Sequence, residues 1–193
     1  MLILMDIEGT TTSISFVTEV LFPYAKKHLH TFLDGNTDPS VASILKQVES
    51  TKQEEALAGE AWEILLRWID EDRKHPALKE LQGKIWNKGY NSGELKGHVY
   101  PDVPFCLKEW IAKGHTLAVY SSGSIQAQKL LFSHTDFGDL TVFFTDYFDT
   151  TTGPKKESES YLKIKNKLAL VTGSSGGLGE AIAESLAKEG VEV

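Results

Sequence analysis

Carboxylate, hydroxyl and ammonium groups follow or adjoin three of the strands that this sequence predicts. Asp6 and Glu8 come directly after the apolar run MLILM, with one residue between them. Ser121 and Ser122 end the run HTLAVYSS, and Lys155 lies in GPKKESESY. A nucleophilic carboxylate, a second carboxyl for proton transfer, hydroxyl donors and a fixed ammonium together suit phosphoryl transfer.

Electrostatics explains why these groups are needed together. A phosphate ester repels an attacking carboxylate unless cations cancel the charge, and a hard divalent ion such as Mg²⁺ at Asp6 would do so. Lys155 would add a point charge on the transferring group. Serine hydroxyls and the N–H groups at a helix start bind phosphate oxygens. The hypothesis therefore requires Lys155 to lie close to Asp6 in the folded chain.

The surrounding elements predict an α/β fold with a parallel sheet. Four apolar runs are expected to be strands: MLILM, HTLAVYSS, LTVFF and KLALVTG. Helices are expected between them, in VPFCLKEWIAKG, SIQAQKLLFSH and GPKKESESYLKI. Strands that alternate with helices indicate a parallel sheet covered on both faces. In such a sheet, chemistry belongs at the carboxyl ends of the strands.

A helical stretch interrupts this pattern after the first strand, near residues 16–96. Within it, AWEILLRWI places Trp62, Leu65, Leu66 and Ile69 on one face of an amphipathic helix. The expected organisation is a core of residues 1–14 and 97–164, a helical cap of residues 15–96, and a C-terminal segment of residues 165–193.

Several segments resemble the enolase-phosphatases, also called acireductone synthases, of the haloacid dehalogenase-like superfamily. They are DIEGTTTSISFV with VLFPYA, GHVYPDVP, VYSSGSIQAQKLLF and FDTTTGPKKESESY, all within residues 1–164. The resemblance implies a Rossmann-like core with an inserted helical cap, and a Mg²⁺-dependent hydrolase of methionine salvage in the cytoplasm and also the nucleus. Such an enzyme enolises 2,3-diketo-5-methylthiopentyl-1-phosphate and then removes the phosphate to give acireductone.

The same resemblance implies residue roles. Asp6 is expected to be the nucleophile and a metal ligand, and Glu8 to bind the metal through its backbone carbonyl and to act as acid or base. Ser121 and Ser122 are expected to hold the substrate, and Lys155 its phosphate. One Mg²⁺ per chain, a small phosphorylated diketone as partner, and a monomer are expected.

The C-terminal segment resembles a different family. TGSSGGLG fits the T-G-x-x-x-G-x-G fingerprint of short-chain dehydrogenases through Gly173, Gly177 and Gly179. Such glycines let the backbone approach the pyrophosphate of a dinucleotide. An acidic residue for the ribose is expected about 20 residues further on, and the sequence stops at Val193 before that strand develops. A working dehydrogenase is therefore not expected, and an NAD(P)-binding fragment is one alternative function.

The run KLALVTG also leads to a second alternative. It could take the place of the family's strand that ends in a metal-binding Asp, where this sequence has Gly173 after the neutral Thr172. A Mg²⁺ site held by one or two carboxylates and waters tolerates the loss of a charged ligand poorly. The second alternative is thus the same fold with impaired catalysis, through lower Mg²⁺ affinity.

Charge and composition argue against other classes of protein. The net charge of −7 over 193 residues leaves no excess of Lys and Arg to neutralise nucleic-acid phosphates. The single cysteine, Cys106, allows no internal disulfide and is expected to be a small buried side chain. No apolar run approaches the length of a membrane span or a signal peptide. We therefore expect no nucleic-acid or membrane partner, and a cytoplasmic location.

Overall fold

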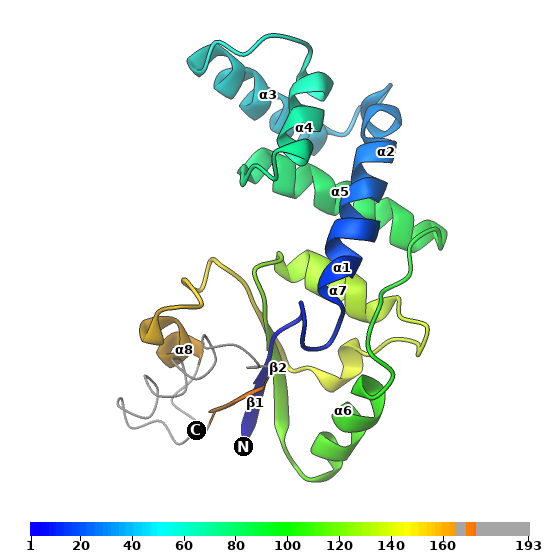
Figure 1. Ribbon diagram of the computed structural model, residues 1–193, viewed down its shortest axis with the longest axis vertical. Coiled ribbons are helices and arrows are strands. Elements are labelled where there is room, and N and C mark those ends of the chain that lie inside the picture. The colour runs from blue at the N-terminus through cyan, green and yellow to red at the C-terminus, as the bar shows by residue number, and fades with distance from the viewer. Residues whose placement is uncertain (165–168, 173–193) are drawn as a thin grey trace. The chain divides into compact units, whose positions relative to one another are not determined.

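The computed structural model describes residues 1–164 and, for the backbone alone, residues 169–172 (Figure 1). The chain divides into two compact units. The helical unit is Ser15–Leu95, and the core unit combines Met1–Ile14 with the described residues from Lys96 onward. Among the described residues, no helix is both long enough and apolar enough to cross a membrane.

The core unit is built on a parallel sheet, which confirms the predicted α/β fold class. The strands described are β1 (Leu2–Met5), β2 (Thr116–Tyr120), β3 (Asp146–Phe148) and β4 (Ala169–Thr172), in the order β3-β2-β1-β4. The helices of this unit are α6 (Val103–Ala112), α7 (Ile125–Ser133) and α8 (Ser158–Ile164). Helix α8 lies on one side of β1 and β2, and α6 lies on the other side (Figure 1). Parallel neighbours require such crossover connections.

The register of the sheet brings the carboxyl ends of its strands level with one another. Met5, the last residue of β1, is paired with Val119 on one side and Thr172 on the other. Tyr120, the last residue of β2, is paired with Phe148, the last residue of β3. The loops after β1, β2 and β3 therefore begin at the same edge of the sheet.

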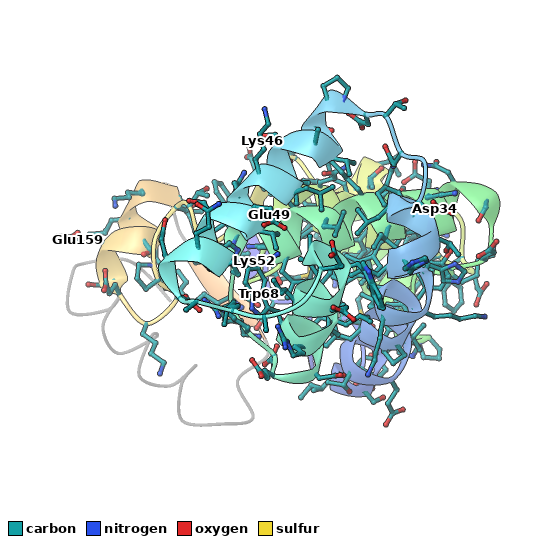
Figure 2. The ribbon with its side chains drawn as sticks, turned by 90° about the horizontal axis from the view of Figure 1, so that it is seen from above. Asp34, Lys46, Glu49, Lys52, Trp68 and Glu159 are labelled. Carbon is teal, nitrogen blue, oxygen red and sulfur yellow. The ribbon has the colours of Figure 1, made fainter. Side chains whose placement is uncertain are left out.

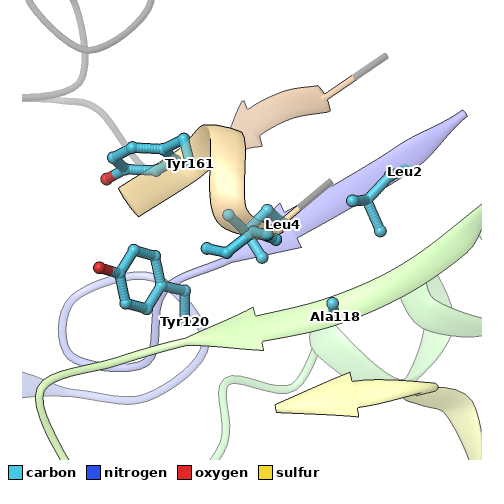
Figure 3. Close-up of a cluster of buried hydrophobic side chains, with 6 residues drawn as sticks. Leu2, Leu4, Ala118, Tyr120 and Tyr161 are labelled. Atoms are coloured by element: carbon cyan, nitrogen blue, oxygen red, sulfur yellow. The ribbon is translucent and has the colours of Figure 1, made fainter. Parts of the chain in front are cut away.

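The sheet is buried on both faces. The cluster between the sheet and α8 consists of Leu2, Leu4, Ala118, Tyr120, Tyr161 and Ile164 (Figure 3). The intervening residues of β1 and β2 point to the other face and are no more than 2% exposed; they are Ile3, Met5, Leu117 and Val119. Burial on both faces is why these strands read as unbroken apolar runs in the sequence.

The prediction of a strand in LTVFF is wrong. The chain forms a short 3₁₀ helix there, η2 (Thr141–Phe143), and β3 begins only at Asp146. The Asp139 carboxylate accepts hydrogen bonds from both the N–H and the hydroxyl of Thr141, at 2.8 and 2.5 Å, which turns the chain. Val142 is 74% exposed, so this run does not enter the core as a strand. Cys106 on α6 is half-buried rather than fully buried.

The helical unit contains four substantial helices in the described chain. They are α2 (Phe22–Leu33), α3 (Pro39–Glu54), α4 (Ala61–Asp70) and α5 (Pro76–Ser92), preceded by α1 (Ile14–Phe16) and the π-helix η1 (Val17–Leu21). Helices α2 and α3 each pack against both α4 and α5. On α3, Glu49 and Lys52 form an ion pair at 3.4 Å, and both residues are half-buried (Figure 2).

Helix α4 buries a face shifted from the predicted one. Its buried residues are Ile64, Leu65, Trp68 and Ile69. Trp62 and Leu66, which were predicted on the buried face, are half-buried. The Trp62 ring instead meets the ring of His30 edge-on, with centroids 5.0 Å apart. Which stripe of a helix is buried depends on how its neighbours pack, and helical periodicity alone does not settle it.

His75 precedes α5 and favours its neutral form. Its Nδ1 accepts a hydrogen bond from Ala77 N at 3.2 Å, which caps the helix, and its ring lies 4.4 Å from the ring of Trp68. Burial, together with the nearby charge of Arg73, lowers the pKa of His75. The unfolded chain therefore takes up a proton more readily than the folded chain. Stability from this group is full above the unfolded pKa of about 6.5 and is lost as pH falls through the folded pKa.

We expect His75→Asn to weaken the loss of stability in acid. Asparagine at this position accepts the same N–H hydrogen bond and does not titrate. Thermal unfolding at about pH 7.5 and about pH 5.5 should show a smaller difference for this variant than for the unaltered protein, by up to about 1 kcal/mol. His115→Asn, which alters a histidine that caps no helix, serves as control. Equal acid sensitivity of His75→Asn and the unaltered protein would contradict the prediction.

Candidate active site

The loop after β1 holds Asp6 at the carboxyl edge of the sheet. The carbonyl of Ile7 accepts hydrogen bonds from the backbone N–H groups of residues 10–12, at 3.0 to 3.1 Å. Gly9 has a φ of +78° and donates its N–H to Thr12 O at 2.8 Å. A left-handed φ of this kind favours glycine. The segment EGTTT therefore forms a tight, hydrogen-bonded turn that leaves Asp6 at its start.

Asp6 forms an ion pair with Lys155. The Lys155 Nζ lies 2.5 Å from Asp6 Oδ1, which also accepts a hydrogen bond from Ile7 N at 2.7 Å. The two side chains are 34% exposed for Asp6 and 22% for Lys155. Within the part of the chain that the structure describes, Asp6 Oδ2 makes no hydrogen bond. One carboxylate oxygen is therefore anchored, and the other is open to a reacting group.

Ser121 and Ser122 follow β2, the strand next to β1. Ser121 is buried, its N–H donates to Phe148 O at 3.2 Å, and its Oγ accepts from Gly123 N at 3.1 Å. Ser122 is exposed. The chain then enters α7, whose N-cap Ser124 accepts from Ala127 N at 3.3 Å. Hydroxyls and a helix N-terminus thus gather on the edge that carries Asp6.

Asp149 lies at the same edge of the sheet and was not among the residues predicted from the sequence. It follows β3 directly, is 7% exposed, and accepts a hydrogen bond through Oδ2 from Ile125 N at 3.3 Å. Its Oδ1 accepts from both the N–H and the hydroxyl of Thr151, at 2.9 and 2.6 Å. A carboxylate beside the first N–H groups of α7 also complements the helix dipole. The signal was present in FDTT, where an Asp before Thr-Thr is typical of a side-chain-capped turn.

Gln128 is a second residue that the sequence did not reveal. It lies on α7 and is 1% exposed, and its Nε2 donates to both Gly123 O and Phe148 O at 2.8 Å. One side chain therefore ties the loop after β2 to the end of β3. Nothing in SIQAQKLLF distinguishes this glutamine from an exposed helical residue, since its two acceptors are brought together only by the sheet.

The predicted site residues differ in how far the structure describes them. Asp6 and Lys155 are in contact, and Ser121 stands at the end of the adjoining strand. Glu8 is half-buried in the Asp6 loop, where its backbone bridges to Thr12. The predicted dinucleotide-binding glycines, Gly173, Gly177 and Gly179, lie outside the described residues. The catalytic roles of all these residues remain predictions.

The donors of the Asp6 loop suit a hard divalent cation. They are the open Oδ2 of Asp6 and the backbone carbonyl of Glu8, both oxygens. Among the residues described, no three His, Cys, Asp or Glu side chains form a group that could hold a metal by themselves. Mg²⁺ commonly binds through one or two carboxylates together with waters and substrate phosphates. This donor set therefore fits Mg²⁺ that binds jointly with a phosphorylated ligand.

Comparison with known proteins identifies clear relatives. The model of the haloacid dehalogenase-like hydrolase family matches residues 1–184. Enolase-phosphatase E1 of Marinobacter nauticus is 51% identical over 190 residues, which cover 97% of this chain and 83% of that protein. Enolase-phosphatase E1 of Pseudomonas savastanoi pv. phaseolicola is 55% identical over 164 residues, which cover 84% of this chain and 72% of that protein.

A solved structure shows the same similarity in three dimensions. The crystal structure of UTR4 protein from Saccharomyces cerevisiae matches with a TM-score of 0.77 at 35% sequence identity. The match covers 94% of this chain and 84% of that one. The family model and the Marinobacter protein both match beyond residue 164, the limit of the resemblance noted from the sequence.

Proposed function

We propose that this chain, which belongs to the enolase-phosphatases among the haloacid dehalogenase-like hydrolases, converts 2,3-diketo-5-methylthiopentyl-1-phosphate to acireductone and phosphate. The substrate is first enolised and its phosphate ester is then hydrolysed. Asp6 is the nucleophile of the second step, and Lys155 binds the group that is transferred. The helical unit serves as the cap of the enzyme.

The ion pair between Asp6 and Lys155 is the observation that carries this proposal. The two residues come from opposite ends of the described sequence, yet Lys155 Nζ lies 2.5 Å from Asp6 Oδ1. A carboxylate that approaches a phosphate ester is repelled by it, and a fixed ammonium reduces that repulsion. The effect is larger in a partly buried site than in bulk water, because the effective dielectric constant is lower.

The chain's own groups account for the bonds that change. Asp6 Oδ2 forms a bond to phosphorus while the bond from phosphorus to the ester oxygen breaks, and the leaving oxygen takes a proton from Glu8. Water then attacks the phosphorus of the aspartyl phosphate and gives a proton to Glu8. The bond between phosphorus and Asp6 Oδ2 breaks, so phosphate is released and the Asp6 carboxylate is restored. In the enolisation, Glu8 is the acid–base group of the same loop that moves a proton from carbon to carbonyl oxygen.

Asp6 and the backbone carbonyl of Glu8 are the groups that would hold one Mg²⁺. The ion supplies positive charge that lowers the repulsion between the carboxylate and the phosphate. Ser121 and Ser122 would hold the phosphate oxygens through their hydroxyl groups, because the N–H groups of Ile125 and Ala127 at the start of α7 already donate to Asp149 and Ser124. These donors orient the ester so that its phosphorus faces Asp6.

One observation favours a second candidate, the same fold with impaired catalysis. Strand β4 pairs with β1 so that Thr172 is level with Met5. In the sequence, Thr172 is followed by Gly173, which has no side chain, whereas Met5 is followed by Asp6. The sequence therefore has no carboxylate directly after this strand. We expect weaker Mg²⁺ binding as the consequence.

We expect phosphate release to require Mg²⁺ and to saturate only at high Mg²⁺ concentration. Phosphate would be measured with the purified chain and the diketone phosphate while Mg²⁺ is varied, and acireductone followed by its absorbance. EDTA should stop release, and added Mg²⁺ should restore it. Full turnover at micromolar Mg²⁺ would contradict the impaired candidate. No phosphate release at any Mg²⁺ concentration would contradict the proposed activity.

The NAD(P)-binding alternative has a separate test. NADH fluorescence would be titrated with the purified chain in the absence of the phosphate substrate. A saturable change in fluorescence would support dinucleotide binding, and an unchanged signal would end that alternative. This result is independent of the phosphatase assay, because the two candidate sites use different residues.

A further inference from the structure

Three side-chain hydroxyl groups donate hydrogen bonds to three consecutive backbone carbonyls of the loop that carries Lys155. The three donors are buried and each makes one hydrogen bond to the loop. The bonds run from Tyr120 Oη to Gly153 O at 2.6 Å, from Ser160 Oγ to Pro154 O at 2.8 Å, and from Tyr161 Oη to Lys155 O at 2.8 Å. The carbonyl groups of residues 153–155 are therefore all held by hydrogen bonds from buried side chains.

The donors come from a strand and a helix of the core unit. Tyr120 ends β2, and Ser160 and Tyr161 lie on α8; they are 2%, 1% and 7% exposed. The two tyrosine rings meet at a steep angle with centroids 5.5 Å apart. Figure 3 shows both hydroxyl groups directed toward the carboxyl ends of the strands. Burial raises the pKa of both tyrosines, so their hydroxyls remain protonated donors at neutral pH.

Gly153 lets the loop come this close to α8. A Cβ placed on Gly153 would lie only 2.2 Å from Ser160 Oγ, and the φ of Gly153 is +146°. Any side chain would therefore push the loop away from the serine hydroxyl and strain the backbone as well. The glycine and the three hydroxyls act together on the same short segment.

The ring of Tyr120, one of the three hydrogen-bond donors, also lies near the side chain of Lys155. Its Nζ lies 5.8 Å from the centroid of the Tyr120 ring and 2.5 Å from Asp6 Oδ1. A lysine side chain has several rotatable bonds and loses considerable entropy when its ammonium is held in one place. An anchored backbone reduces the number of positions that the ammonium can reach.

We infer that Tyr120, Ser160 and Tyr161 are positioning residues that hold Lys155 against the transferring phosphoryl group. The inference rests on the proposed role of Lys155 in phosphate transfer. None of the three hydroxyls needs to touch the substrate, because each is used by a carbonyl of the loop. Catalysis depends on them since a displacement of about 1 Å in a catalytic group can cost about a hundredfold in rate.

Tyr161→Phe tests this role with little change in shape. It removes the hydrogen bond to Lys155 O and keeps the buried ring. We expect kcat for phosphate release to fall by about tenfold or more. KM should change less than kcat, because Lys155 binds the phosphate in the substrate complex and must also be placed correctly for the transfer itself. Tyr147→Phe is the matched control, since within the described chain the buried Tyr147 hydroxyl has no hydrogen-bond partner; it should keep the original kcat.

A double-variant experiment separates positioning from general stability. In a Lys155→Gln background, Tyr161→Phe should cause no further loss of rate, because the group that it positions is gone. The same fractional loss in both backgrounds would show a merely structural role and would overturn the inference. So would a Tyr161→Phe kcat equal to that of Tyr147→Phe. If Tyr161→Phe does not fold, Ser160→Ala, which removes the neighbouring hydrogen bond, replaces it in both comparisons.

Hydrogen exchange distinguishes failure of this inference from failure of the proposed function. If the unaltered protein releases no phosphate, the proposed function fails, and exchange in the peptide that spans residues 149–157 still reports on the loop. Faster exchange there in Tyr161→Phe than in Tyr147→Phe supports the anchoring of Lys155. Equal exchange in the two variants overturns it.

Discussion

Replacing Asp6 with asparagine is expected to abolish phosphate release while leaving the fold intact. The amide keeps the size of the side chain, but it has no charged oxygen that can form a bond to phosphorus. Removal of a catalytic nucleophile lowers kcat by a factor of about 10⁴ or more. The fold should persist, since the ion pair with Lys155, in which both side chains keep some exposure to solvent, contributes only about 1 kcal/mol.

Single-turnover phosphate release gives the sharpest measurement for Asp6→Asn, because it reaches rates too slow for steady-state assays. Asp136→Asn is a matched control; Asp136 is exposed in the loop after α7 and should tolerate the same substitution. A covalent phosphoryl group, detected by mass spectrometry in the unaltered protein and absent from Asp6→Asn, is the expected companion result. Asp6→Asn with more than about one hundredth of the original kcat would show that Asp6 is not the nucleophile.

Lys155→Gln is expected to have the next largest effect, a loss of about 10²- to 10³-fold in kcat. The substitution removes the charge that lies 2.5 Å from Asp6 Oδ1. It leaves Asp6 without its cation, so repulsion between the carboxylate and the incoming phosphate is no longer offset. Arginine would not restore the site fully, because its planar group has a different shape and reach.

Lys156→Gln is the matched control for Lys155. The two lysines are adjacent in sequence and carry the same charge, but Lys156 is exposed and Lys155 is partly buried against Asp6. Both variants alter the net charge equally, so a general effect of charge on substrate attraction would appear in both. Equal loss of activity in the two variants would refute a specific role for Lys155. Thermal unfolding of both should stay close to that of the unaltered protein.

The strands and the residues at their ends could be predicted from the sequence, because a strand that is buried on both faces appears as an unbroken apolar run. The run MLILM stops abruptly at Asp6, and HTLAVY stops at Ser121, so strand ends and polar side chains coincide. The strand predicted in LTVFF failed because apolar composition was taken for burial. Local capping by Asp139 turned this run into a 3₁₀ helix and left Val142 in solvent.

Gln128 and the hydroxyls that bind the Lys155 loop could not be predicted in the same way, and Asp149 had only the local signal in FDTT. Gln128 and Tyr120 bind carbonyls far along the chain, Phe148 O and Gly153 O, and the Ser160 and Tyr161 hydroxyls bind carbonyls six residues before them. A glutamine or tyrosine in an apolar segment is usually a half-buried packing residue, so the residue type alone does not predict a hydrogen bond to a loop carbonyl. The contact exists because the sheet register places two loops side by side.

By itself, then, the sequence determined the fold class, and it predicted the edge where chemistry is expected and the candidates Asp6, Glu8, Ser121, Ser122 and Lys155. They could be predicted because apolar strand runs, turn residues and reactive side chains can all be recognised within short segments of the sequence. Only the tertiary structure decided that Lys155 reaches Asp6, and which buried groups hold it there. The physical reason is that distances between remote segments depend on strand register and helix packing, which many weak contacts set together.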